Sequence, residues 1–240
     1  MGRNTVREVI NANPQSIISI FVSTSAEHDP KLVEALNLAQ QSDIPVERIQ
    51  NQNLASLLNS DSHQGIAAKV KRKNLIELQE LVHDLEAQPS SIVLMLDGVQ
   101  DPHNIGALLR TSECFNVSAV IWSKNKGPGI TPVVTKTSSG ASELVPICIV
   151  SNLQQTIKKL KEIGFWAVSA DVSTESHDLY NFKFPEKTLL ILGSEGTGAS
   201  NIVNKEADFI VSLKVLGQID SLNVSQAAAV FISKFREQFS

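Results

Sequence analysis

The sequence contains no apolar run that approaches the roughly 20 residues needed by a bilayer-spanning helix. Its first residues, MGRNTVREVINANP, also lack the apolar segment of a secretory signal. Cysteine is scarce, since only Cys114 and Cys148 occur, and both stand among apolar neighbours. We therefore expect no membrane segment, a cytoplasmic location and two reduced cysteines in the protein core.

The signatures of several enzyme classes are missing as well. There is no zinc-ligand spacing, no G-x-S-x-G nucleophile motif and no H-E-x-x-H helix, so we expect no bound metal. Glycines follow the apolar run that ends at Leu192. Their positions, 193, 196 and 198, fit neither the dinucleotide motif G-x-G-x-x-G nor a P-loop.

The net charge of the chain does not indicate a function by itself. The formal net charge is −4 at pH 7, which is not typical of a nucleic-acid binder. The sequence has one dense basic run, KVKRK from Lys69 to Lys73. This run is as consistent with a solvated strand end as with an RNA contact.

The pattern of apolar residues predicts two α/β domains joined by a linker helix over residues 75–90. Residues 1–74 predict a small domain with helices near 4–11, 30–41 and 53–59 and strands at 17–23, 46–50 and 64–71. Residues 91–240 predict a larger domain with strands at 92–96, 118–122, 144–150, 165–170, 188–192 and 208–213 and helices near 104–115, 152–163 and 222–238. Continuous Val, Ile and Leu in these strands predict a parallel sheet covered by helices on both faces. The Gly- and Pro-rich stretch 123–142 predicts a long functional loop.

Polar residues gather in three loops, DGVQDPHNIGALLRTSE, LGSEGTGAS and DSLNVSQAAAV, each of which follows a predicted strand. In open α/β sheets, ligands bind beyond the carboxyl ends of the strands, and glycine permits a close approach to the backbone. Structural alternatives remain for each loop. Arg110 can pair with Glu113 on a helix surface, the glycine loop can be a tight turn, and Asn223 can bond the first turn of a helix that Asp220 or Ser221 caps.

In order and spacing, the three loops resemble the three motifs of the SpoU (TrmH-like) branch of the SPOUT RNA methyltransferases. The segments GRNTVREVI and HQGIAAKVK resemble the RNA-binding domain of bacterial members that act on a guanosine of 23S rRNA. The resemblance covers nearly the whole chain. It implies that residues 91–240 form a SPOUT methyltransferase domain with a deep trefoil knot on a parallel sheet, and that residues 1–74 form an L30-like α/β domain that binds the RNA substrate.

The resemblance also implies an activity, namely S-adenosylmethionine-dependent 2′-O-ribose methylation of large-subunit ribosomal RNA by a homodimer whose active sites lie at the subunit interface. It assigns catalytic or substrate-positioning roles to Asn104, Arg110, Glu195, Ser221 and Asn223, and cofactor binding to Gly193, Leu213 and Leu222. It assigns RNA binding to the N-terminal domain, where the candidate residues are Arg3, Arg7, Lys69, Lys71 and Arg72. Lys214 stands where related enzymes usually carry proline.

The role of Arg110 has two interpretations. A base role is proposed for this arginine in the family, but a guanidinium holds its proton too tightly to act readily as a base near pH 7. We favour a clamp on phosphate and on the developing alkoxide, with base action as the alternative. Transfer RNA as the substrate, or a non-catalytic RNA-binding assembly factor with the same fold, are the alternative functions.

Overall fold

The computed structural model describes residues 1–240 except 27–28, 72–74, 174–175, 219–220 and 240. The chain divides into two compact units. The first comprises Met1–Asn74 and Pro132–Leu144, and the second comprises Leu75–Thr131 and Val145–Ser240. The segment Pro132–Leu144 thus groups with the N-terminal residues, although the sequence pattern placed it in the larger domain.

The first unit is built on a three-stranded sheet in the order β2-β1-β3. β1 (Ile17–Ser23) pairs in parallel with β2 (Val46–Ile49) and antiparallel with β3 (Ile66–Val70). The helices of this unit are α1 (Arg3–Ala12), α2 (Pro30–Gln41), α3 (Asn51–Leu58) and α6 (Pro132–Thr137). Val6, Val9 and Ile10 recur at helical spacing on α1 and enter the core with Ile20 and Val22 of β1.

The prediction of a continuous loop over residues 123–142 was wrong at its C-terminal end. α6 lies inside this stretch and is followed by a 3₁₀ turn over Ala141–Glu143. Val134 is completely buried, and Gly140 adopts a φ of +89° beside the side chain of Val9. A helix of one or two turns is too short to produce a recognisable apolar period, so the composition of the stretch pointed to a loop.

The second unit contains a seven-stranded sheet in which every strand pair is parallel, as the sequence predicted. The strand order is β6-β5-β4-β9-β7-β10-β8. The strands are β4 (Ser91–Asp97), β5 (Ala119–Ser123), β6 (Ile147–Val150), β7 (Trp166–Ala170), β8 (His177–Asp178), β9 (Lys187–Gly193) and β10 (Phe209–Ser212). The central strands β4 and β9 end level with each other, since Asp97 is the register partner of Gly193.

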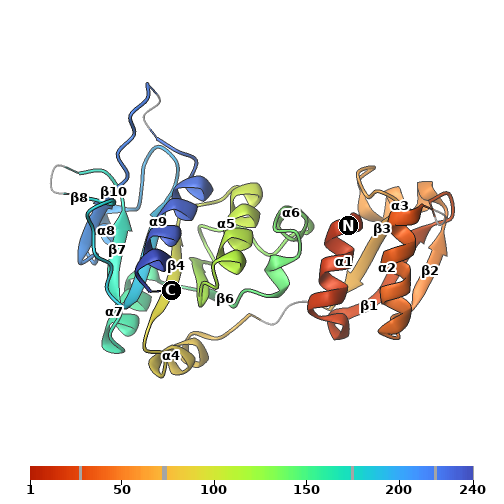
Figure 1. Ribbon diagram of the computed structural model, residues 1–240, viewed down its shortest axis with the longest axis horizontal. Helices are drawn as coiled ribbons and strands as arrows, with labels where there is room; N and C mark the ends of the chain where they lie inside the picture. Colours follow the sequence, from red (N-terminus) through yellow and green to blue (C-terminus); the bar gives the residue numbers. More distant parts are fainter. Residues whose placement is uncertain (27–28, 72–74, 174–175, 219–220, 240) are drawn as a thin grey trace. The chain divides into compact units, whose positions relative to one another are not determined.

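Helices cover both faces of this sheet (Figure 1). Val93 and Met95 of β4 belong to the core cluster that contains α4 (Leu78–Glu86), α7 (Leu153–Glu162) and α8 (Asn201–Asn204). The alternate residues of β4 point to the opposite face, where α5 (Pro102–Cys114) and α9 (Val224–Gln238) pack together. Because both faces are covered, all seven residues of β4 are buried.

α9 begins two residues after the predicted start near 222, and its cap differs from the predicted one. Asn223 is the N-cap, and its Oδ1 accepts a hydrogen bond from the backbone N–H of Ser225 at 2.9 Å. The prediction of Ser221 as the cap was therefore wrong, and Asp220 lies outside the described residues. Asn, Asp and Ser are comparable caps, so sequence alone does not rank neighbouring candidates.

The C-terminal half of α9 is held against the end of α5 by Arg236. Its Nε donates to the carbonyl oxygen of Phe115 at 2.8 Å, and its Nη2 donates to that of Asn116. We expect Arg236→Ala to lower the free energy of unfolding by about 1–3 kcal/mol, because charge-assisted hydrogen bonds to the two carbonyls disappear. Thermal and urea unfolding measure this loss. Glu237→Ala, at an exposed neighbour on the same helix, is the control, and an equal loss in both variants would contradict the assignment.

The two cysteines occupy different environments. Cys148 is buried as expected, but Cys114 is exposed, so the core prediction was wrong for Cys114. The buried face of α5 carries Ile105, Leu108, Leu109 and Ser112, and Cys114 falls outside it. Burial, with a smaller contribution from Glu77, raises the pKa of the Cys148 thiol to about 11.

This difference predicts selective labelling by thiol reagents. Only the thiolate reacts, so Cys148 stays protonated and protected well above neutral pH, whereas Cys114 is accessible. At pH 8 the native protein should release about one equivalent of chromophore from a disulfide reagent per chain, and the unfolded protein two. Mass spectrometry should place the first label on Cys114. Rapid native labelling of Cys148 would be inconsistent with its burial.

Candidate active site

Three side chains from three separate segments of the second unit form one hydrogen-bonded cluster. Asn104 lies in the first turn of α5, Glu195 follows β9, and Asn223 precedes α9. Asn223 Nδ2 donates to Glu195 Oε1 at 2.7 Å and to Asn104 Oδ1 at 2.8 Å. Asn104 Nδ2 also donates to Glu195 Oε1, at 3.1 Å. Three residues that the sequence analysis assigned to the site therefore meet.

Every hydrogen-bonding group of the Asn223 side-chain amide is engaged in contacts within the protein. Both Nδ2 hydrogens are donated within the cluster, and Oδ1 accepts from the backbone N–H and the hydroxyl of Ser225 at 2.9 and 2.6 Å. Asn223 thus caps α9 and orients Glu195 at the same time. It has no donor or acceptor left for a ligand, so its contribution is that of a positioning residue.

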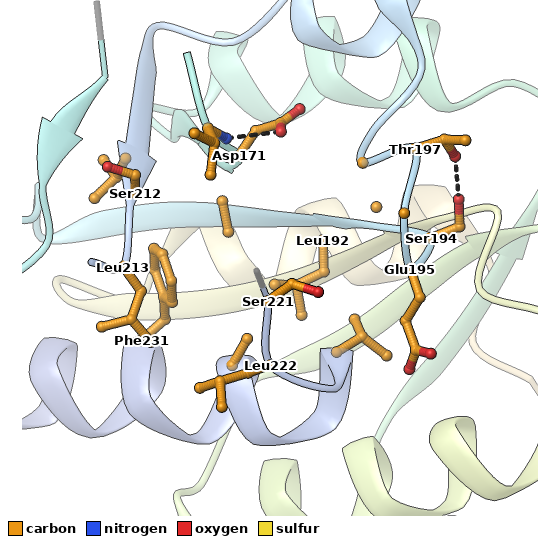
Figure 2. A pocket seen from close by; sticks show the side chains of 18 of the residues that line it. Asp171, Leu192, Ser194, Glu195, Thr197, Ser212, Leu213, Ser221, Leu222 and Phe231 are labelled. Carbon is orange, nitrogen blue, oxygen red and sulfur yellow. Dashed lines mark hydrogen bonds between the residues drawn. The ribbon is translucent and has the colours of Figure 1, made fainter. Parts of the chain in front are cut away.

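The conformation of the turn that carries Glu195 depends on its glycines. A Cβ on Gly193 would lie 1.9 Å from the carbonyl carbon of Gly198, and Gly198 itself has a φ of +67°. The backbones of Ser194 and Gly198 exchange two hydrogen bonds of 3.1 and 2.9 Å. The hydroxyls of Ser194 and Thr197 form a hydrogen bond of 2.7 Å, which is drawn as a dashed line in Figure 2. The closed turn leaves Glu195 exposed at its tip.

A cavity of about 600 Å³ lies beside this turn, between the loops that follow β7, β9 and β10 (Figure 2). Its lining combines apolar side chains, among them Leu192, Leu213, Leu222 and Phe231, with the carboxylates of Asp171 and Glu195. Its volume lies within the range of about 300–1,000 Å³ that is usual for small-molecule and cofactor pockets. Apolar walls with a few polar groups suit a ligand that has a flat ring and a charged end.

Two carboxylates near the glycine turn, Asp97 and Asp171, were not predicted from the sequence as site residues. Asp97 has a side chain only 2% exposed, and its Oδ2 accepts hydrogen bonds from the backbone N–H of Ser200, at 2.9 Å, and from the Ser200 hydroxyl. Asp171 accepts from Asn204 Nδ2 at 2.8 Å and from the N–H of Val172 at 2.7 Å. Both follow or end a run of apolar residues, and a carboxylate at such a strand end was the available signal.

The structure places most of the other predicted residues at the cavity as well. Gly193, Leu213 and Leu222, which were assigned to the cofactor, line the cavity, and so does Ser221. Arg110 lies on α5, six residues beyond Asn104, where it is exposed and does not belong to the cavity lining. Its predicted role toward RNA is therefore separate from cofactor binding.

The predicted RNA-binding residues of the first unit are of two kinds. Arg3 Nη1 forms an ion pair with Asp29 Oδ2 at 2.8 Å, and Arg7 Nη1 forms one with Glu34 Oε2 at 3.3 Å. Lys69 lies in β3, an edge strand, and Lys71 follows that strand; both are exposed. Arg72 lies outside the described residues. The two lysines are consequently better candidates for phosphate contacts than the two arginines.

Neither a metal cluster nor a membrane span is visible in the part of the chain that the structure describes. No group of three or more His, Cys, Asp or Glu residues among those described is arranged to hold a metal ion. No helix within the described ranges has the length and apolar character needed to cross a membrane.

Comparison with known proteins identifies the family. Residues 91–233 match the model of the SpoU rRNA methylase family, and residues 1–75 match that of the RNA 2′-O ribose methyltransferase substrate-binding domain. The chain belongs to the SpoU rRNA methylase family. Its resemblance to this family, predicted from the three loops, is confirmed.

Relatives of this SpoU protein extend over its full length. The 23S rRNA (guanosine-2′-O-)-methyltransferase RlmB of Neisseria meningitidis is 34% identical over 238 residues, which cover 99% of this chain and 94% of the relative. Among solved structures, the SpoU methyltransferase AviRb of Streptomyces viridochromogenes, in complex with AdoMet, has a TM-score of 0.79 at 20% identity and covers 100% of this chain and 89% of its own. The A. aeolicus TrmH/SpoU tRNA modifying enzyme has a TM-score of 0.57 at 27% identity, over 67% of this chain and 81% of its own.

Proposed function

We propose that this SpoU protein is an S-adenosylmethionine-dependent methyltransferase that modifies a ribose 2′-hydroxyl of large-subunit ribosomal RNA, at a guanosine of 23S rRNA, in the cytoplasm. The observation that carries the proposal is the Asn104–Glu195–Asn223 cluster beside a cavity of cofactor size. The full-length similarity to RlmB favours rRNA over tRNA, because the tRNA modifying enzyme aligns with only 67% of this chain.

The cavity suits S-adenosylmethionine in shape and chemistry. Leu213, Leu222 and Phe231 provide apolar walls for the adenine, while Asp171 offers a carboxylate for ribose hydroxyls or the ammonium group. The backbone of the 193–198 turn adjoins the cavity, and a side chain at Gly193 would force this turn open. When bound, S-adenosylmethionine supplies an activated methyl carbon on a sulfonium.

The chain itself has to align the ribose oxygen and stabilise its developing charge. Asn104 and Glu195 are fixed by Asn223 and face the ribose, whereas Ser221 is available for a hydrogen bond at the cavity rim. Arg110 clamps the neighbouring phosphate and the developing alkoxide with its planar guanidinium. We include in the proposal a trefoil knot around the cofactor loops, and a homodimer whose interface completes the active site.

Methylation of whole rRNA by the purified protein with radiolabelled S-adenosylmethionine tests this proposal. We expect label in 23S rRNA, and reverse transcription at low nucleotide concentration should stop at a single guanosine. Label in tRNA alone would show that the substrate is tRNA and not rRNA. Absence of label in all RNA, together with no heat of cofactor binding in calorimetry at millimolar ligand, would overturn the enzymatic function.

The proposal also predicts that Lys69 and Lys71 contact RNA phosphates. Lys69→Glu combined with Lys71→Glu should weaken RNA binding about tenfold or more at low salt and reduce the slope of log affinity against log salt by about 1 for each lost contact. Filter binding over a salt series measures both quantities. Lys183→Glu, an exposed lysine in the second unit, is the control. If the slope of log affinity against log salt is unchanged in the double variant, Lys69 and Lys71 do not contact RNA phosphates.

A further inference from the structure

A second, smaller pocket lies across the glycine turn from the cofactor cavity. It measures about 290 Å³ and is lined by Asp97, Gly98, Lys126, Ser194, Thr197, Gly198, Ala199, Ser200 and Asn201. Ser194, Thr197 and Gly198 line the 600 Å³ cavity too, so the 194–198 turn is a wall that the two pockets share. The proposed reaction does not use this smaller pocket.

The pocket occupies the position in the sheet at which open α/β proteins bind ligands. β4 and β9 are adjacent and end level at Asp97 and Gly193. β4 leads into α5, whereas β9 leads into α8, which packs in the core cluster on the opposite face. Neighbouring strands whose connections depart to opposite faces leave a crevice beyond their carboxyl ends. The loops that follow β4 and β9 line the 290 Å³ pocket.

The pocket presents an acceptor and a donor side by side. Asp97 is buried, and its Oδ2 accepts two hydrogen bonds from Ser200. The other carboxylate oxygen, Oδ1, faces Lys126. Lys126 Nζ lies 3.6 Å from Oδ1, which is longer than a hydrogen bond, and its side chain is 55% exposed. Each group can therefore bond a ligand without losing a tight internal partner.

The turn that carries Lys126 is well defined. Lys126 N–H donates to the carbonyl of Ser123 at 3.2 Å, and the Trp122 indole donates to the carbonyl of Pro128 at 3.1 Å. A Cβ on Gly127 would lie 2.3 Å from Cδ1 of Trp122, so the backbone of this turn rests on the indole ring. Lys126 is thus presented from a fixed turn.

We propose that this pocket receives the base of the target nucleotide, with Asp97 and Lys126 as its specificity-determining residues. A carboxylate beside an ammonium complements an edge with a ring N–H next to a carbonyl oxygen, and the Watson–Crick edge of guanine has N1–H next to O6. Enzymes that act on RNA commonly read an unstacked base on this edge. An inorganic anion is disfavoured, because the buried Asp97 carboxylate would face it. The inference rests on the proposed guanosine methylation.

The test compares an RNA fragment that carries guanosine at the mapped site with one that carries 2-aminopurine riboside there. The analogue lacks O6 and N1–H but keeps the 2-amino group and the ribose. We expect the wild-type protein to methylate the guanosine fragment about ten- to a hundredfold faster in kcat/KM, as for one good bidentate base contact. Lys126→Met should reduce this preference at least several-fold and leave cofactor affinity unchanged, because Lys126 lies outside the cofactor cavity.

Two further variants make the test decisive. Asp97→Asn can keep an acceptor toward Ser200 and turn its amide donor toward the pocket, so it should shift the preference toward 2-aminopurine, whose N1 is an acceptor. Lys124→Met, at an exposed lysine outside the pocket lining, should preserve the wild-type preference. The proposed base pocket is overturned if Lys126→Met lowers kcat/KM equally on both fragments. It is also overturned if Lys126→Met and Asp97→Asn both keep the wild-type preference. If the wild-type protein methylates no RNA, the proposed function itself fails.

Discussion

Arg110→Lys is expected to slow single-turnover methylation by about 10²–10³-fold, the usual effect of removing a donor aimed at transition-state charge. Lysine keeps the positive charge but loses the planar fork that binds phosphate and alkoxide together. Arg110→Ala should be at least as slow. Cofactor affinity should stay nearly constant in both variants, because Arg110 does not line the 600 Å³ cavity. Rapid-quench kinetics and calorimetry on each variant measure the two quantities.

The pH dependence of the methylation rate distinguishes a clamp role of Arg110 from a role as the base. A clamp predicts that Arg110→Lys gains no more from rising pH than the wild type does, whereas a lysine that acts as the base would add a new titration to the rate profile. Glu113→Ala is the matched control on the same helix, since Glu113 is the partner that a purely surface role would give Arg110. Near-wild-type turnover in Arg110→Ala would leave Arg110 without a part in catalysis.

Asn223→Asp is expected to lower the single-turnover rate about 10²-fold while leaving the fold intact. Aspartate can still cap α9 through Ser225, so the variant should fold, although the lost contacts with Glu195 and Asn104 lower its free energy of unfolding. It cannot donate to Glu195 Oε1, however, and would place a second carboxylate at the 2.7 Å contact. Loss of the two hydrogen bonds from Nδ2, together with like-charge repulsion, corresponds to roughly 3 kcal/mol.

A rate profile against pH gives this prediction a distinctive signature. Two facing carboxylates can share a proton when the pH falls, and the shared proton replaces the lost hydrogen bond. The ratio of the Asn223→Asp rate to the wild-type rate should therefore rise as the pH is lowered. Asn223→Ala removes the cap and the cluster contacts without adding charge, so its ratio should stay flat. A flat ratio for Asn223→Asp as well would argue against the direct contact with Glu195.

Local patterns predicted the elements of both units with few exceptions. Runs of Val, Ile and Leu marked all six principal strands of the larger sheet, and most of these residues are buried because helices cover both faces. The spacing of Val6, Val9 and Ile10 predicted α1 in the same way. α6, β8 and α8 were missed because they are short. Cys114 was misplaced because its apolar sequence neighbours do not lie on its side of α5.

The sequence by itself determined the three loops and the residue types in them, because a loop after a strand and a cap before a helix are local features. Only the tertiary structure decided which of these side chains meet. Asn104 reaches Glu195 across 91 positions, and Asn223 reaches Asn104 across 119. Strand order and the level ends of β4 and β9 produce these contacts and bring Asp97 and Lys126 to one pocket. The spacing of apolar residues along the sequence indicates which face of a helix or strand is buried, but not which element packs against that face.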